Sequence, residues 1–347
     1  MEEKWLNYLQ CPDCGRANLL LFIFDKRRSS GIVSCRVCKQ WFIVRDGILE
    51  LIPEEFNWQN KTKFYLENRQ ALMELGKMSP PNKHAMNNKI RYKREQAIFF
   101  DKFFEKERKN YQESPFWKAE YSLSLTPLIA KTTKDSVIVD AGCGEGACGL
   151  ALYKKGMTTI GFDVSRHSIF VANEKARRRG ISDNVFFFVG DAEHPPLVSN
   201  MADVYILFAV LHHVVSPKDV LSEAARIMKP EGNFFAHDNN ASGLRWAFDL
   251  LMRLMPLWEE KAAREHLFSI SEINHLAKKT GLILKSRTQV FLPPHFYNLF
   301  SPKEARVMLN FTNFVFNLIP SLRNHGGIII IEGRKVNNIT GIIRHRR

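Results

Sequence analysis

The 347-residue sequence lacks the usual marks of a secreted or membrane-spanning chain. No apolar run follows the opening Met1-Glu2-Glu3-Lys4, so no secretory signal is visible. No stretch approaches the roughly 18 uninterrupted apolar residues of a membrane span. Cysteine is scarce, at six residues, and four of them lie in CxxC pairs, which favours a metal site in a reducing compartment over a disulfide scaffold. We therefore expect a cytoplasmic protein.

Acidic residues are fewer than basic residues, so the chain has a net charge of +14. The excess lies in two flanks: residues 59–135 carry +7 and residues 241–347 carry +9, whereas residues 136–240 carry −2. A basic flank can contact nucleic acid, an anionic lipid surface or an acidic substrate, or can be an ordinary solvated helix face. The charge pattern alone leaves these alternatives open.

The four paired cysteines have the spacing of a zinc site. Cys11 and Cys14 form one CxxC pair, Cys35 and Cys38 form the second, and 20 residues separate the pairs. Two such turns at the ends of a short hairpin can supply four sulfurs in a tetrahedron, which suits zinc. Paired redox dithiols are the alternative. A structural zinc has a closed coordination shell, so we assign these cysteines to folding and not to catalysis.

The surroundings of these cysteines resemble a known module. The segments "YLQCPDC" and "WFIVRDGILELI" resemble the small zinc-ribbon activator that partners tRNA, rRNA and translation-factor methyltransferases. The resemblance covers about residues 5–53. It implies a module that binds and stabilises a methyltransferase, and it implies no chemistry of its own.

A glycine-rich turn marks a cofactor site in the middle of the chain. The apolar run Val137-Ile138-Val139 ends in Asp140 and leads into Ala141-Gly142-Cys143-Gly144-Glu145-Gly146-Ala147, followed by a helical stretch. Glycines let the backbone approach a ligand closely, and the helix amino terminus carries partial positive charge. The pattern also fits a dinucleotide fingerprint. By itself it does not choose between a nicotinamide cofactor and S-adenosylmethionine.

Three later strand ends make that choice. One apolar run ends in Asp163, a second is followed by Gly190-Asp191-Ala192, and a third ends in Phe208 and is followed by Ala209-Val210-Leu211-His212-His213. With "GDAEHPPL" and "LHHVVSPKDVLSEAARIMKPEGNFF", they closely resemble class I S-adenosylmethionine-dependent methyltransferases over roughly residues 120–240. The resemblance implies an α/β fold, a seven-stranded Rossmann-like sheet with helices on both faces, whose final strand runs antiparallel.

The resemblance also implies a role for each matched residue. The implied cofactor contacts are Gly142, Cys143 and Gly144 along the methionine portion, Asp140 at the glycine loop and the ammonium group, Asp163 at the ribose with Val164 beside it, Asp191 and Ala192 at the adenine, and Phe208 and Ala209 facing the methyl sulfonium. His212 is the candidate catalytic base, because it follows the strand that faces the methyl group. A base is needed only if the attacking atom holds a proton.

The sequence therefore divides into four parts: a zinc ribbon (1–57), a helical linker or cap (58–134), a methyltransferase domain (135–335) and a basic tail (336–347). Within the third part, residues 244–258 and 306–319 are nearly apolar helices with one thin polar stripe each. Such helices are buried, cover an apolar pocket, or lie on a membrane. We expect Trp246, Phe311 or Phe314 to reach the methyl cavity.

The leading functional interpretation is an S-adenosylmethionine-dependent methyltransferase with a small or lipid-like acceptor, with peripheral membrane contact left open. The alternative is an rRNA or tRNA methyltransferase that uses the ribbon and the basic flanks to bind RNA. Against it, no Asn-Pro-Pro-Tyr-type motif follows Phe208. A third hypothesis is a non-enzymatic binding module, which the acids at Asp163 and Asp191 disfavour. The oligomeric state and the acceptor atom are not indicated.

Overall fold

The computed structural model describes residues 1–25, 29–77, 80–257 and 266–336, without the side chains of Trp58 and residues 103–112. The expected basic tail therefore lies outside the described residues except for Val336, as does the last residue of the expected helix 244–258. The domain boundaries at 57, 134 and 335 stay predictions.

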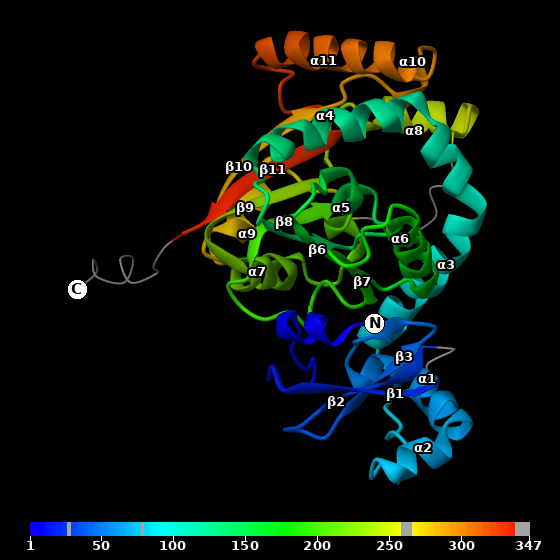
Figure 1. Ribbon diagram of the computed structural model, residues 1–347. Helices are drawn as coiled ribbons and strands as arrows, with labels where there is room; N and C mark the ends of the chain where they lie inside the picture. The colour runs from blue at the N-terminus through cyan, green and yellow to red at the C-terminus, as the bar shows by residue number, and fades with distance from the viewer. Residues whose placement is uncertain (26–28, 78–79, 258–265, 337–347) are drawn as a thin grey trace.

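One mixed sheet of eleven strands organises the chain, in the order β1-β2-β3-β4-β7-β6-β5-β8-β9-β11-β10. The strands are β1 (Leu19–Asp25), β2 (Ser30–Cys35), β3 (Trp41–Arg45), β4 (Ile48–Glu50), β5 (Val137–Ala141), β6 (Thr158–Asp163), β7 (Val185–Val189), β8 (Ala202–Phe208), β9 (Met228–Asn239), β10 (Leu282–Gln289) and β11 (Ile328–Lys335). Figure 1 shows the β1–β4 ribbon at one end of the molecule and the larger part of the sheet above it.

Seven of these strands form the expected α/β core. Strands β5 to β9 run parallel, and β11 lies antiparallel between β9 and β10, so the prediction of an antiparallel final strand is confirmed. The central strand β8 is buried on both faces because its residues are apolar at consecutive positions. Val204 and Ile206 pack towards α4 and α11, whereas Tyr205 and Leu207 pack towards α7 and α9.

The predicted fold class is confirmed, but the number of strands differs, because the ribbon strands extend the seven-stranded core into one sheet of eleven. Strand β4 pairs in parallel with β7 at Glu50 and Val189, and the Leu51 N–H donates to the Val189 carbonyl (2.9 Å). Trp5 stacks on Phe186 with 5.1 Å between ring centroids. The physical reason is the open edge of β7, whose backbone groups need a partner that the ribbon supplies.

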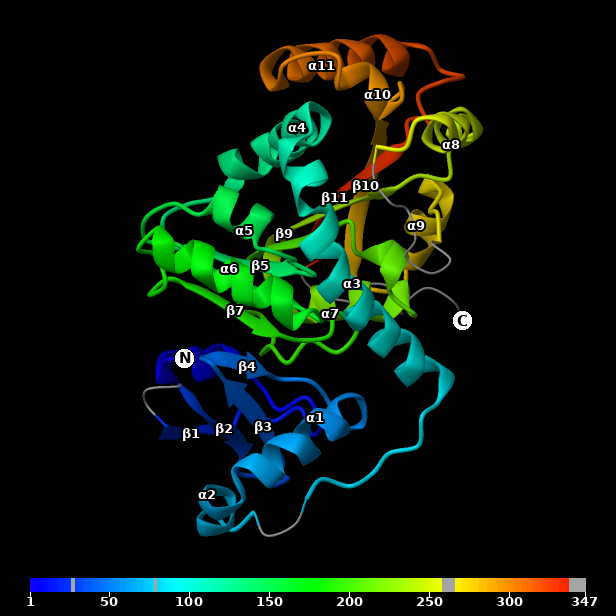
Figure 2. The same ribbon diagram turned by 90° about the vertical axis from the view of Figure 1, so that its right-hand side faces the viewer.

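The helices cover both faces of the sheet. They are η1 (Glu3–Tyr8), α1 (Glu54–Glu67), α2 (Arg69–Glu74), α3 (Asn88–Glu113), α4 (Pro115–Lys131), α5 (Ala147–Leu152), α6 (Arg166–Arg178), η2 (Leu211–His213), α7 (Pro217–Ile227), α8 (Arg245–Leu254), α9 (Ile270–Ala277), α10 (Pro294–Tyr297) and α11 (Pro302–Leu318). Figure 2 shows α3 beginning beside the ribbon and leading to α4 near the opposite end, where α8, α10 and α11 lie. Helix α11 starts earlier than expected because Ser301 and Glu304 form a capping box. None of the helices within the described ranges has the length and apolarity to cross a bilayer.

Candidate functional site

A cavity of about 790 Å³ opens at the carboxyl ends of the parallel strands. It is lined by the turns after β5, β6, β7 and β8, which is where open α/β sheets bind ligands. All ten predicted cofactor contacts lie on its wall, as does His212: they are Asp140, Gly142, Cys143, Gly144, Asp163, Val164, Asp191, Ala192, Phe208 and Ala209. The structure therefore brings these residues together, while their individual roles stay predictions.

The glycine loop between β5 and α5 is held against the next strand. The N–H groups of Gly142 and Cys143 donate to the Phe162 carbonyl (2.8 and 3.0 Å). Gly142 has a φ of +67°, and a Cβ there would lie only 2.5 Å from Val210 Cγ2. Glycine is required at this position because both the backbone angle and the close approach exclude a side chain.

Asp140 is the second-last residue of β5, just before this loop. Its Oδ2 accepts a hydrogen bond from the Gly149 N–H (2.8 Å), which ties the start of α5 to the strand. Burial raises the pKa of Asp140 to about 7, and the nearby Asp163 carboxylate adds to the rise. Asp140 therefore changes its charge near neutral pH.

Asp163 ends β6 with both carboxylate oxygens already positioned. Oδ2 accepts from the Gly144 N–H (2.9 Å) and Oδ1 accepts from the Ser165 N–H (2.8 Å). Burial raises the pKa of Asp163, and these backbone hydrogen bonds act in the opposite direction. Each oxygen has a second lone pair, so the carboxylate can still accept bonds from a pair of hydroxyl groups.

Asp191 follows β7 and is bound by a lysine that the sequence patterns did not single out. Lys93 of α3 contacts Asp191 Oδ2 and lies 2.6 Å from Glu193 Oε2, and it also lies over the ring of Phe56. The turn that carries Asp191 is further held by the ribbon, since the Gln10 N–H donates to the Pro196 carbonyl (2.9 Å). Helix α3 thus forms part of this side of the site, and the ribbon holds the turn that follows Asp191.

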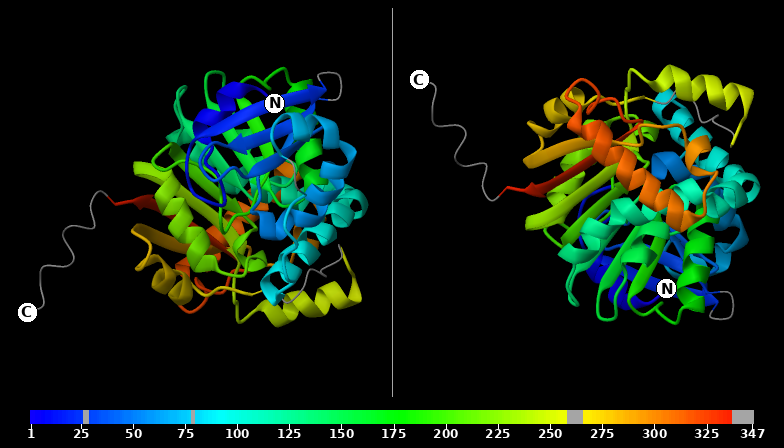
Figure 3. Two further views of the ribbon diagram at one scale, coloured as in Figure 1. Left: turned by 90° about the horizontal axis from the view of Figure 1, so that it is seen from below. Right: turned by 90° about the horizontal axis from the view of Figure 1, so that it is seen from above.

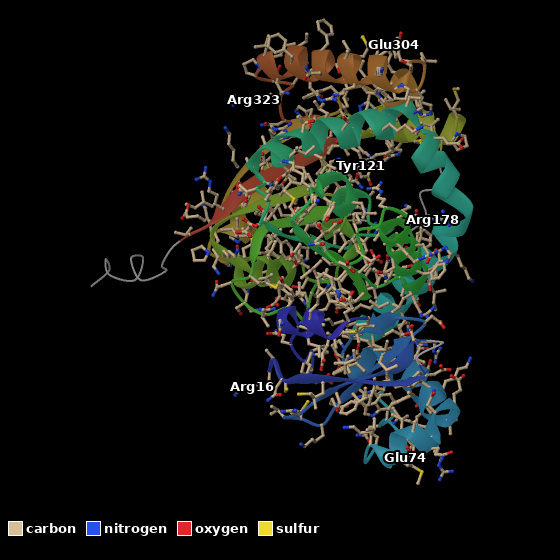
Figure 4. The ribbon with its side chains drawn as sticks, viewed as in Figure 1. Arg16, Glu74, Tyr121, Arg178, Glu304 and Arg323 are labelled. Carbon is tan, nitrogen blue, oxygen red and sulfur yellow. The ribbon has the colours of Figure 1, made fainter. Side chains whose placement is uncertain are left out.

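A stack of three rings forms the wall at the end of β8. Phe208 lies between Tyr121 of α4 (4.2 Å between centroids) and His237 of β9 (3.9 Å). His237 Nε2 lies 2.9 Å from Glu120 Oε1, which also accepts a hydrogen bond from Ser124 Oγ (2.6 Å). Figure 4 shows Tyr121 on the α4 side of the core. This buried pair was not predicted, although a histidine directly after the apolar residues Phe234-Phe235-Ala236 was a signal.

The candidate base His212 is oriented by a carboxylate. Its Nδ1 lies 2.6 Å from Asp238 Oδ1, and the second oxygen of Asp238 accepts from the Leu211 N–H (2.8 Å). Burial alone would raise the pKa of Asp238, but the charge and hydrogen bond of His212 outweigh it and hold that pKa below its usual value. The neighbouring His213 has a pKa lowered to about 3 by burial and by His212, so it is neutral at physiological pH. Asp238 contacts His212 directly, whereas it acts on the pKa of His213 through its charge and is outweighed there by burial.

The two core cysteines are not nucleophiles. Burial raises the pKa of Cys143 and of Cys148 well above the ordinary thiol value, and the nearby Asp140 carboxylate raises both further. A nucleophilic cysteine requires the opposite shift. Both side chains are buried and pack in the apolar core as small hydrophobic groups.

Beyond Phe208, the cavity continues between α4, α8 and the segment after β10. The side chains that line this part are mainly aromatic and aliphatic: Phe116, Trp117, Tyr121, Leu244, Ala247, Phe248, Val290, Phe291, Leu292 and Phe316. The expectation that Trp246, Phe311 or Phe314 reaches the cavity is wrong, because all three are exposed and absent from its wall. Phe248 and Phe316 of the same two helices take that place, since they lie on the inward faces.

The four ribbon cysteines converge as predicted. Their sulfur atoms all lie within 4.8 Å of one another, with 3.5 Å between Cys11 and Cys38 and 3.7 Å between Cys14 and Cys35. Four sulfurs at this separation fit the donor set of a tetrahedral zinc ion. Asp13, in the first CxxC turn, accepts a hydrogen bond from the Glu54 N–H (3.3 Å), which connects the cluster to the start of α1.

Residues 132–291 match a family model described as a methyltransferase domain. Among curated proteins, the chain is 32% identical over 154 residues to the methyltransferase GfsG of Streptomyces halstedii, covering 44% of this chain and 55% of GfsG. It is 28% identical over 126 residues to the ubiquinone biosynthesis O-methyltransferase of Escherichia fergusonii, covering 34% and 51% of the two chains. The chain thus spans about half the length of the curated relatives it matches.

One solved structure aligns with this chain at low similarity. The complex of the Trm112 methyltransferase activator with a methyltransferase from Haloferax volcanii aligns with a TM-score of 0.48 at 19% identity. The alignment covers 69% of this chain and 98% of the matched chain.

Proposed function

We propose that this chain is a class I S-adenosylmethionine-dependent methyltransferase that transfers a methyl group to a small or lipid-like apolar acceptor. The match of residues 132–291 to a methyltransferase domain supports the reaction class. The observation that carries the acceptor class is the aromatic and aliphatic lining of the cavity beyond Phe208. Such a wall binds apolar surface by excluding water and offers few partners to a phosphate backbone. The acceptor reaches the methyl-donor site within the same cavity.

The residues present fit S-adenosylmethionine. Asp163 would accept hydrogen bonds from two ribose hydroxyls, Asp191 would accept one from the adenine amino group, and Asp140 would attract the methionine ammonium. Glycine at position 142 keeps the loop free of a side chain that would fill the cleft. When bound, S-adenosylmethionine supplies a methyl group made electrophilic by its sulfonium.

The protein contributes orientation, exclusion of water and a proton acceptor. The stacked rings of Tyr121, Phe208 and His237 give a fixed wall beside Ala209. Correct in-line placement of the two reactants is worth at most about 7–11 kcal/mol of the barrier. His212 takes the proton from an acceptor hydroxyl, and Asp238 keeps Nδ1 as the donor, so Nε2 is the basic atom.

The names of the relatives support an oxygen acceptor on a small molecule. One relative is a ubiquinone biosynthesis O-methyltransferase, and a hydroxyl group attached to an apolar body fits both the lining of this cavity and a role for His212. An acceptor of this kind resides in or near a bilayer. We therefore extend the proposal to an enzyme that works in the cytoplasm with peripheral membrane contact.

We assign a zinc ion to Cys11, Cys14, Cys35 and Cys38, with a structural role. Four thiolates close its coordination shell, so the ion has no position for substrate. The ribbon it stabilises braces the turn after Asp191 through the contact between Gln10 and Pro196. The zinc supports the cofactor site at a distance and takes no part in the reaction.

The acceptor class is tested with tritium-labelled S-adenosylmethionine, labelled in the methyl group. The protein is incubated separately with a total lipid extract, a water-soluble metabolite extract and total RNA from the source cells. We expect label in an organic-extractable product with wild type and, at a limiting concentration of S-adenosylmethionine, much less with Asp163→Asn. Label that appears only in ribonuclease-sensitive material would replace this proposal with the RNA methyltransferase alternative.

A further inference from the structure

Helix α11 exposes an apolar stripe in addition to the face that it packs on the core. Val307, Phe311, Phe314 and Leu318 are 59–68% exposed. Their spacings of four, three and four residues place them on one stripe along the helix. The inward face combines the fully buried apolar residues Ala305 and Leu309 with two polar residues, Thr312 and Asn313.

The inward polar residues of α11 bind the body of the protein. Asn313 Oδ1 accepts the Val290 N–H (2.9 Å), and Thr312 is buried against α10. Buried polar groups with partners fix the rotation of a helix, because turning it would leave them unsatisfied. The apolar stripe is therefore held outward by the fold and has no packing role within the described chain.

Helix α8 presents a second stripe at the same end of the molecule. Trp246, Leu250 and Leu254 recur every four residues and are 49–69% exposed, whereas Met252 is buried. Figure 1 places α8 and α11 at the end opposite the ribbon, and Figure 3 shows both helices from above, on one side of the molecule. Exposed apolar surface of this extent marks an interaction site. We call these outer surfaces of α8 and α11 the α8–α11 face.

The charges around the α8–α11 face are mostly basic. Residues 244–257 and 298–323 contain five basic and two acidic side chains. Both acids are engaged locally: Asp249 pairs with Arg245 (2.8 Å), and Glu304 closes the capping box of α11. Lys303, Arg306 and Arg323 are exposed. Figure 4 shows Glu304 and Arg323 towards opposite ends of α11.

We propose that the α8–α11 face docks on an anionic lipid bilayer. The two stripes supply apolar side chains that enter the headgroup boundary, and the basic residues meet anionic headgroups. A second copy of the chain would set this excess of positive charge against itself. A nucleic acid would neutralise the charge but leave both stripes in water.

The cavity lies directly behind this face. Phe248 of α8 and Phe316 of α11 line the cavity from the inward sides of the same two helices that expose Leu250 and Leu318. A lipid-like acceptor held in the bilayer would therefore meet the protein at the helices that cover the acceptor end of the site. This last step rests on the proposed function, whereas docking itself does not.

The test is flotation of the purified full chain with phosphatidylcholine vesicles, with and without phosphatidylglycerol. We expect flotation with the anionic vesicles, weaker flotation without them, and loss of binding in high salt. The double variant Phe311→Ser/Phe314→Ser should weaken binding by roughly tenfold for each ring removed from the bilayer. The matched control is Phe170→Ser, an exposed phenylalanine on α6 away from the face, which should float like wild type.

Double substitutions of basic residues separate the electrostatic contribution to vesicle binding from the apolar one. Lys303→Gln/Arg306→Gln should reduce binding to anionic vesicles only, and Lys155→Gln/Arg178→Gln, two exposed basic residues elsewhere, should not. Thermal unfolding shows that each variant is folded. Wild type that stays at the bottom of the gradient, or Phe311→Ser/Phe314→Ser that floats unchanged, overturns the proposal. If light scattering shows a dimer that only Phe311→Ser/Phe314→Ser dissociates, and wild type does not bind vesicles, the face is assigned to contact with a second copy of the chain. Calorimetry with S-adenosylmethionine judges the proposed function separately.

Discussion

Replacing Asp163 with asparagine tests the ribose contact at the cofactor site. Both carboxylate oxygens accept backbone N–H groups, from Gly144 (2.9 Å) and Ser165 (2.8 Å). The NH₂ group of asparagine cannot accept a hydrogen bond. The variant therefore loses one backbone bond, one bond to a ribose hydroxyl and the negative charge. One charge-assisted hydrogen bond is worth about 1.5–3 kcal/mol, so S-adenosylmethionine should bind about 10- to 100-fold more weakly. Asp163→Ala loses two such bonds and should weaken binding by about 10²- to 10⁴-fold.

The assay is isothermal titration calorimetry of the folded variants, with thermal unfolding measured in parallel. The control is Asp203→Asn: this aspartate also accepts a backbone N–H, from Val137 (2.8 Å), but it is not on the cavity wall. It should lose some stability and retain wild-type affinity for S-adenosylmethionine. Equal affinity in wild type and a folded Asp163→Ala would refute the assignment of Asp163 to the ribose.

Further expected outcomes concern pH, the base and the metal. The pKa of Asp140 is raised to about 7, and its ionised form attracts an ammonium group. Affinity for S-adenosylmethionine should therefore rise from pH 5 to pH 7, by at most about tenfold per pH unit, and level off above pH 7. Calorimetry of Asp140→Asn should show an affinity that does not change with pH. His212→Gln should slow methyl transfer by about 10²- to 10⁴-fold with unchanged cofactor affinity, and an unaltered rate in the labelled-methyl assay would exclude it as the base. Elemental analysis should find one zinc per chain, and chelation should lower the melting temperature because a metal site of four thiolates contributes directly to folding.

The residues predicted to hold the cofactor meet at one cavity because they follow local rules. Asp140, Asp163 and Asp191 each come at or just after the end of an apolar strand, and the ends of parallel strands meet at one edge of a sheet. The cluster of four cysteines was equally predictable from the sequence, since two CxxC turns have few other structural uses. In both cases spacing along the chain determined which groups meet in space.

The remaining features depend on long-range packing. The pairing of β4 with β7 joins residues 50 and 189, and no local pattern shows which open edge a short ribbon strand will find. Lys93 looked like any other solvated lysine of a basic helix until α3 was placed over Asp191. Glu120 and His237 meet from α4 and β9, far apart in the sequence.

The orientation of α11 shows a different limit. Helical periodicity predicted a mainly apolar helix with one thin polar stripe, but periodicity does not say which of the apolar residues face inward. The expectation assumed that Phe311 and Phe314 would turn to the cavity. The partners offered by Tyr297 and Val290 to Thr312 and Asn313 turn them outward instead.

The central claim, that this chain uses S-adenosylmethionine, is tested most directly by calorimetric titration of the wild-type protein with that cofactor and, separately, with NAD and NADH. The account predicts one S-adenosylmethionine bound per chain and no heat of binding for either nicotinamide cofactor. Saturable binding of NAD or NADH to a folded protein that does not bind S-adenosylmethionine would contradict it.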